Sequence, residues 1–153
     1  GPKSLGIGGE QWAGPRNFSR HLATADRKFA ALYAGQSVPA KFLIGCLVLF
    51  DRRLPATIGA FDENFPLGAD DFDLALRIRK NGYQLRIAQD VLIEHTVHAS
   101  FHRSDPVDTD RLATASWQYF NRKWRSELEK YGWERLFEDE LPVFPGEKPF
   151  GQA

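Results

Sequence analysis

The spacing of apolar residues predicts three amphipathic helices and one short helix. Apolar positions recur at helical intervals over residues 19–34, 70–80 and about 108–131, and a glycine follows each stretch directly or after one residue. Residues 52–59 form a fourth, shorter helical stretch that ends at a glycine. Helices therefore form most of the predicted regular structure.

Three apolar stretches predict strands. Residues 42–50, FLIGCLVLF, are apolar on both alternating faces, which is typical of a strand covered on both sides. Residues 84–88 and 91–95 predict two shorter strands. Taken with the helices, they predict an α/β fold in which a small mixed β-sheet is flanked by helices.

The domain organisation follows from length and from glycine and proline content. The 153 residues suit one domain, which we assign to residues 18–132. Residues 1–17 read as a loop extension, and residues 133–153, rich in proline and glycine, as an extended tail. Gly1-Pro2 resembles the remnant of a removed affinity tag, and the chain contains no methionine. We therefore expect a piece of a longer protein.

Charge and cysteine content exclude several classes of function. Lys plus Arg and Asp plus Glu number 20 each, and the balanced, scattered charge argues against a nucleic-acid binder. The single cysteine, Cys46, lies in the apolar run and predicts a buried thiol and a reducing compartment. We expect a cytoplasmic protein, either free or at the cytoplasmic face of a membrane within a longer parent.

The acidic stretch GADDFDLALRIRKNGY, residues 68–83, carries the candidate chemistry. On a helix, Asp70, Asp73 and Arg77 share one face, and Asp73 and Arg77 have the spacing of an ion pair. Asp71 leans toward the apolar stripe. Carboxylates at a helix start stabilise the free N–H groups there, and we expect Asp70 to act in this way.

Two chemical alternatives to a purely structural role differ in how well they fit. A calcium-binding loop numbered from Asp62 would need a ligand and a glycine where Pro66 and Leu67 stand, so this alternative fails. A general base fits better, because a carboxylate beside a second carboxylate can accept a proton from a hydroxyl. The residues alone leave the helix-start role and the base role both open.

A series of short motifs resembles the C-terminal, acceptor-side half of family 2 glycosyltransferases, which have the GT-A fold. The resemblance covers roughly residues 38–125. The motifs are IGC (44–46), Arg52-Arg53, Ile58-Gly59, FDENF (61–65), GADDFDLALR (68–77), NGY (81–83), Val91, His95, Ser100-Phe101 and FNRKW (120–124).

The resemblance implies an inverting transfer of a sugar from a nucleotide-diphosphate sugar to an acceptor hydroxyl. The acidic pair, commonly Glu-Asp in the family, falls on Asp70 and Asp71; it implies Asp71 as the base and Asp70 as an acceptor contact. Gly45 matches a glycine at the acceptor site. His95 matches a histidine that approaches the divalent metal, Mg²⁺ or Mn²⁺, in some relatives.

The resemblance also implies missing parts. The family's nucleotide-binding half and its Asp-x-Asp metal motif have no counterpart before Val38, and the literal matches at 71–73 and 108–110 do not follow strands. The Gln-x-x-Arg-Trp motif of processive relatives is absent, which implies a non-processive enzyme. We expect this chain alone to be inactive.

The expected partners are a nucleotide-sugar donor, a sugar or glycan acceptor and the missing N-terminal half. A homodimer through exposed apolar surface is a further expectation. The alternative function is a non-catalytic binding or interaction module that keeps the glycosyltransferase shape.

Overall fold

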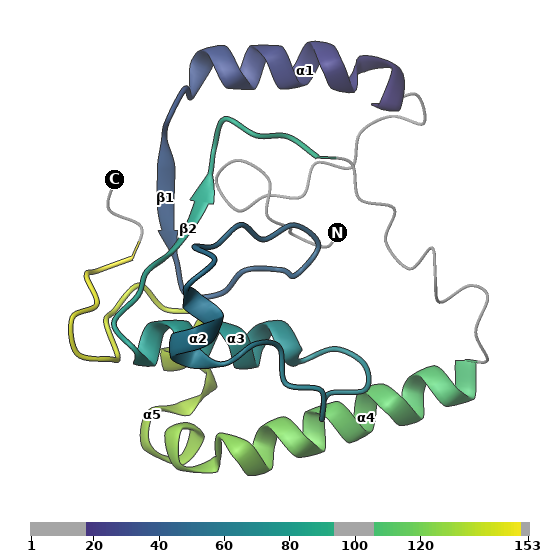
Figure 1. Ribbon diagram of the computed structural model, residues 1–153, viewed down its shortest axis with the longest axis vertical. Coiled ribbons are helices and arrows are strands. Elements are labelled where there is room, and N and C mark those ends of the chain that lie inside the picture. Colours follow the sequence, from purple (N-terminus) through teal and green to yellow (C-terminus); the bar gives the residue numbers. More distant parts are fainter. Residues whose placement is uncertain (1–17, 94–105, 151–153) are drawn as a thin grey trace.

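The computed structural model describes residues 18–93 and 106–150 and shows helices around a small sheet (Figure 1). None of the helices in these ranges is long and apolar enough to cross a membrane. The elements are α1 (Phe18–Leu32), β1 (Ser37–Ala40), α2 (Leu54–Ile58), α3 (Asp70–Lys80), β2 (Leu85–Ala88), α4 (Pro106–Lys123) and α5 (Arg125–Phe137). The predicted α/β class is confirmed.

The sheet of the described part has two antiparallel strands, so the predicted mixed sheet is wrong. β1 pairs with β2 in a register that runs from Ser37 opposite Ala88 to Ala40 opposite Leu85. β2 confirms the strand predicted at 84–88, while β1 was not predicted because its four residues, SVPA, are few and include a proline. Residues 91–93 are irregular, and 94–95 lie outside the described residues.

The strand predicted at 42–50 is an irregular loop with a turn at its centre. Leu49 is 97% exposed and Leu47 is 61% exposed, and Cys46 is exposed rather than buried. The apolar pattern predicts covering layers on both sides, but β1 and β2 pair only as far as Ala40 and Leu85. Phe42 and Leu43 pack against the first cluster, but without a neighbouring strand Ile44, Leu47, Leu49 and Phe50 stay exposed in the described part of the chain.

α3 lies between the sheet and the pair α4–α5 and contributes to both hydrophobic clusters (Figure 1). Leu74, Ala75 and Ile78 pack toward the sheet side, with Ala40, Leu54 and Leu85. Leu76 packs on the other side. The second cluster comprises Ala69, Leu76, Phe120, Trp124, Leu136 and Phe144. Because α3 is buried on both sides, the position of its first turn is fixed by both clusters.

The long helix predicted over 108–131 is two helices that meet at Trp124. This residue has non-helical dihedral angles, and its side chain is buried in the second cluster. Gly132, predicted to end the helix, has a φ of 75° and produces a kink, after which α5 continues to Phe137. Along the two helices, Phe120 and Trp124 are buried in the second cluster and Leu128 and Tyr131 pack against it, whereas Trp117 is 37% exposed.

The C-terminal segment is not simply an extended tail over the surface. α5 includes residues 133–137, and Leu136 is fully buried. Phe144, in the irregular stretch that follows, is only 6% exposed and packs in the second cluster. The region after residue 132 is thus part of the core, because it supplies large apolar side chains as well as turns.

Candidate functional site

The acidic start of α3 is set by two consecutive residues in the left-handed conformation. Gly68 has a φ of 72° and Ala69 a φ of 64°. For an alanine this conformation costs about 1–2 kcal/mol, and the burial of the Ala69 methyl in the second cluster offsets it. Ala69 is the N-cap residue and no side chain caps this end, so the cap expected from Asp70 is not formed. Asp70 lies in the first turn, where its charge complements the helix dipole.

Asp71 is half-buried beside the loop that follows β1. Its Oδ1 accepts a hydrogen bond from the backbone N–H of Phe72 at 2.9 Å, and its Oδ2 accepts one from the N–H of Gly45 at 3.4 Å. Burial raises the pKa of Asp71, and the neighbouring charge of Asp70 raises it further, while the two N–H donors oppose the shift. Asp71 is therefore a stronger proton acceptor than an exposed aspartate.

Asp71 lines a small cavity, and this cavity adjoins a larger cleft that Asp71 itself does not line. A small cavity of about 10 Å³, lined by Asp71 and Gly45 among apolar side chains, has room for about one water molecule. It shares Leu43, Val48, Ile78 and Leu85 with an open cleft of about 680 Å³. That volume is in the range of small-molecule sites. Arg53, Tyr83 and Arg86 supply polar groups to its lining.

Gly45 lies against Asp71, but the space around it does not require glycine. A Cβ atom at Gly45 would lie 3.6 Å from the Cβ of Asp71, which is an ordinary contact distance. The functional contact of Gly45 is its backbone N–H. His95, the candidate metal ligand, lies outside the described residues.

Asp73 is fully buried and is held by three donors. Arg77 Nε donates to its Oδ2 at 2.8 Å, which confirms the predicted pair. Trp124 Nε1 and Lys123 Nζ both reach Oδ1, at 2.8 and 2.7 Å. Arg77 also donates to the carbonyl oxygens of residues 58 and 59. Asp73 therefore joins α3 to α4 and to the turn after α2.

Asp62, in the FDENF loop, is bound to the same lysine. Lys123 Nζ lies 2.6 Å from its Oδ2, and the Tyr119 hydroxyl donates to that oxygen at 3.0 Å. Asn64 donates to Oδ1 through its backbone and its side chain. Burial opposes ionisation, but these donors outweigh it and hold the pKa of Asp62 well below its usual range. The loop motif thus has a structural role here.

Sequence reasoning missed the α4 side of this arrangement. Tyr119, Lys123 and Trp124 fall within the FNRKW region or just before it, and helical spacing assigned their neighbourhood to packing alone. The signal that could have identified them is the presence of polar groups within an otherwise apolar stripe. A buried indole N–H or ammonium needs a partner.

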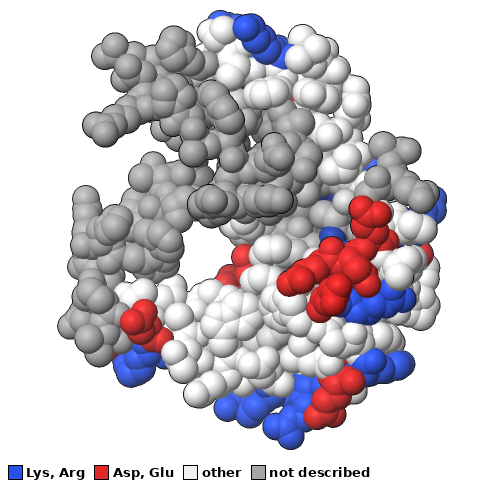
Figure 2. Space-filling view, turned by 180° about the vertical axis from the view of Figure 1, so that it is seen from behind, with Lys and Arg blue, Asp and Glu red and all other residues white. Residues whose placement is uncertain are grey.

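The described residues contain no group of three or more His, Cys, Asp or Glu side chains placed to hold a metal ion. On the face seen in Figure 2, acidic and basic side chains lie beside one another, so this face has no continuous basic surface for nucleic acid.

We compared the chain with known proteins at the level of family, sequence and structure. No protein-family model, no curated protein and no solved structure matches it.

Proposed function

We propose that this chain is the acceptor-side half of an inverting, non-processive glycosyltransferase with a GT-A-like fold. Asp71 is the general base, and Asp70 and Gly45 line the acceptor site. The intact enzyme transfers a sugar from a nucleotide-diphosphate sugar to an acceptor hydroxyl in glycan or polysaccharide synthesis, in the cytoplasm or at the cytoplasmic face of a membrane.

One observation carries the proposal: the environment of Asp71 differs from that of the other two aspartates of the motif. Asp73 has no exposed surface and three cationic or N–H partners, so it is committed to structure. Asp71 keeps partial exposure, accepts only backbone N–H groups, one of them at the long distance of 3.4 Å, and has a raised pKa. A carboxylate in this state is suited to accept a proton.

The proposed reaction assigns Asp71 one proton transfer. As the acceptor oxygen forms a bond to the anomeric carbon of the donor sugar, Asp71 accepts the hydroxyl proton, and the bond to the nucleotide diphosphate breaks. Attack opposite the leaving group inverts the configuration at that carbon. The open cleft of about 680 Å³ beside the Asp71 cavity is the proposed route of the acceptor.

A divalent ion, Mg²⁺ or Mn²⁺, would neutralise charge on the leaving diphosphate. The described residues do not fit such an ion, because they bring no three suitable ligands together. We therefore assign the metal ligands and the nucleotide site to other parts of the enzyme, with His95 as a candidate. No step of the proposal involving the described residues depends on the metal.

The apolar loop 42–50 supports the proposal that another protein surface completes the enzyme. Ile44, Leu47, Leu49 and Phe50 are all exposed, and no charged residue lies among them. Such a patch is typical of an interaction surface. The proposed cover is the N-terminal half or a second copy of the chain. The same exposed patch favours the alternative function, a non-catalytic interaction module.

Nucleotide binding and light scattering test this assignment. Titration of UDP into the 153-residue chain, with Mg²⁺ or Mn²⁺ present, is expected to give weak binding or none. Tight binding would contradict the half-enzyme assignment. A stable monomer, together with an intact parent that has its own Asp-x-Asp motif and no transferase activity, would favour the interaction module.

A further inference from the structure

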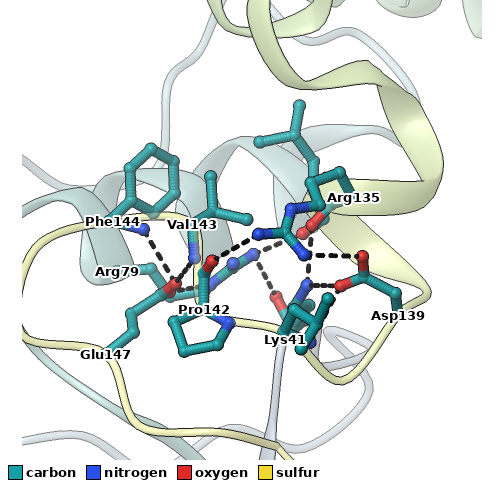
Figure 3. A network of polar contacts seen from close by, with 10 residues as sticks. Lys41, Arg79, Arg135, Asp139, Pro142, Val143, Phe144 and Glu147 are labelled. Atoms are coloured by element: carbon teal, nitrogen blue, oxygen red, sulfur yellow. Dashed lines mark hydrogen bonds and ion pairs between the residues drawn. The ribbon is translucent and has the colours of Figure 1, made fainter.

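Two ion pairs connect the C-terminal segment to the middle of the chain. We name residues 138–150 the C-terminal strap. Asp139 of the strap pairs with Lys41, and Glu147 pairs with Arg79 of α3 (Figure 3). The Lys41, Arg79 and Glu147 side chains are at most 4% exposed. Asp139 is 24% exposed, so the Arg79–Glu147 pair is buried on both sides and the Lys41–Asp139 pair on the lysine side. Removing the carboxylate of either pair is costly, because the remaining cation stays desolvated.

Lys41 is held entirely by C-terminal groups at its ammonium end. Its Nζ donates to the carbonyl oxygen of Arg135 at 2.6 Å and to Oδ1 of Asp139. Arg135 also reaches Asp139, at 3.3 Å, and the carbonyl of Pro142, at 3.2 Å. Burial lowers the pKa of Lys41 and the Asp139 carboxylate opposes this shift, so the charge of Lys41 depends on Asp139.

The main chain of Lys41 is fixed through the second pair. Arg79 Nη1 donates to the carbonyl oxygen of Lys41 at 3.2 Å and to that of Leu136 at 2.6 Å. Arg79 Nε pairs with Glu147 at 2.6 Å. Glu147 in turn accepts the N–H groups of residues 143 and 144. The side-chain ammonium and the backbone carbonyl of Lys41 are thus both hydrogen-bonded within this polar network.

Lys41 is also the residue at which the loop over Asp71 begins. The next residue, Phe42, stacks on the ring of Phe72 with centroids 3.9 Å apart. Gly45, three residues further on, donates its N–H to Asp71. Backbone bonds to other described residues do not hold this loop, since none is present for residues 42–50. Lys41 and the Phe42 stack are therefore its principal anchors at the β1 end.

We propose that Lys41, held by Asp139 of the C-terminal strap, is a positioning residue that keeps the 42–50 loop in contact with Asp71. The strap controls the candidate base without touching it. The inference rests on the proposed function only for the chemical role of Asp71. The contact between loop and carboxylate is a property of the chain itself and is measured without transfer activity.

Asp139→Asn in the full 153-residue chain tests the proposal by NMR. In the unchanged chain, we expect the amide proton shift of Gly45 to follow the ionisation of Asp71, because that N–H donates to the carboxylate. In D139N we expect this titration to lose most of its amplitude and the amide exchange of residues 42–50 to become several-fold faster. The pKa of Asp71 is expected to fall toward its ordinary value, because burial is the largest cause of its rise.

Glu127→Gln is the matched control. It removes the carboxylate partner of Lys80, and that pair also joins α3 to the C-terminal helices but does not contact the loop. E127Q should leave the Gly45 titration, the amide exchange of residues 42–50 and the pKa of Asp71 unchanged. Asp139→Glu, which keeps the charge, should also leave all three unchanged. If D139N does not fold, Lys41→Gln is measured in the same way. A folded D139N or K41Q chain with an unchanged Gly45 titration and Asp71 pKa would overturn the proposal.

Discussion

The indole Nε1 of Trp124 donates a hydrogen bond of 2.8 Å to Oδ1 of Asp73, across the interface between the start of α3 and the end of α4. Both side chains are buried, and Asp73 has no exposed surface. This bond separates the aspartates of the acidic motif into two roles. Asp73 is a structural acceptor, whereas Asp71 and Asp70 do not share in this bond and are the residues that we propose for contact with the acceptor.

Removing the Asp73 carboxylate is expected to destabilise the fold strongly. Asp73→Ala leaves Arg77 without its carboxylate partner and Trp124 without its acceptor, and losing one partner of a buried pair costs about 3–5 kcal/mol. Urea unfolding followed by tryptophan fluorescence measures this loss. Asp70→Asn, in the same turn but without these contacts, should change the free energy of unfolding by about 0.5 kcal/mol or less. Equal effects of the two substitutions would contradict the assignment.

Asp62 predicts a loss of stability in acid. Its folded pKa is held below its unfolded value, so its ionisation stabilises the fold above about pH 4, the ordinary carboxyl range, and this contribution is lost as the pH falls toward the folded pKa. Asp62→Asn should lower the melting temperature at pH 7, and the gap to the unchanged chain should narrow as the pH drops below 4. A gap that is constant with pH would be inconsistent with the Lys123 and Tyr119 contacts. Exposed Glu63, replaced by Gln, is the control.

The C-terminal strap is expected to contribute to stability through Phe144. Its side chain is nearly fully buried against the α5 side chains Tyr131 and Leu136. Phe144→Ala should therefore reduce the free energy of unfolding by about 3–5 kcal/mol. Leu141→Ala, at a position 54% exposed in the same segment, should have little effect. A mild effect of F144A in thermal and urea unfolding would show that the strap is dispensable.

Helical periodicity predicted where α1 and α3 lie, and the packing that supports α3 comes from the chain itself, because its apolar residues join both hydrophobic clusters. The 70–80 prediction coincides with α3, and the Asp73–Arg77 pair follows from spacing alone. Spacing along one helix could not identify the other two side chains that bind Asp73. Trp124 and Lys123 lie about fifty residues away, and only tertiary packing brings them to Asp73.

The strand predicted at 42–50 failed for a different physical reason. Apolar residues on both faces indicate that both faces become covered, but a strand forms only where a second strand supplies hydrogen bonds. Among the described residues that partner is absent, so the segment is a loop with Leu47 and Leu49 exposed. In the structure, Gly45 nevertheless lies close to Asp71, because the loop that leaves β1 runs past the start of α3.

Neutralising Asp71 is expected to stabilise the chain at neutral pH. Its folded pKa is raised above the unfolded value, so the charged form is penalised in the fold. This penalty is absent below the unfolded pKa and fully present above the folded one. Asp71→Asn should therefore melt at the same temperature as the unchanged chain in acid and at a higher temperature at pH 7. A lower melting temperature at pH 7 would indicate that Asp71 is a structural residue.

The most direct measurement is the rate of sugar transfer by the intact enzyme carrying Asp71→Asn, with Asp70→Asn and the unchanged enzyme measured alongside. We expect D71N to retain the fold and donor binding while kcat falls by about 10²–10⁴-fold, the contribution typical of a general base. D70N should lose less, mainly through weaker acceptor binding. Turnover of D71N close to that of the unchanged enzyme would contradict the account, because no proton acceptor would then be needed at this position.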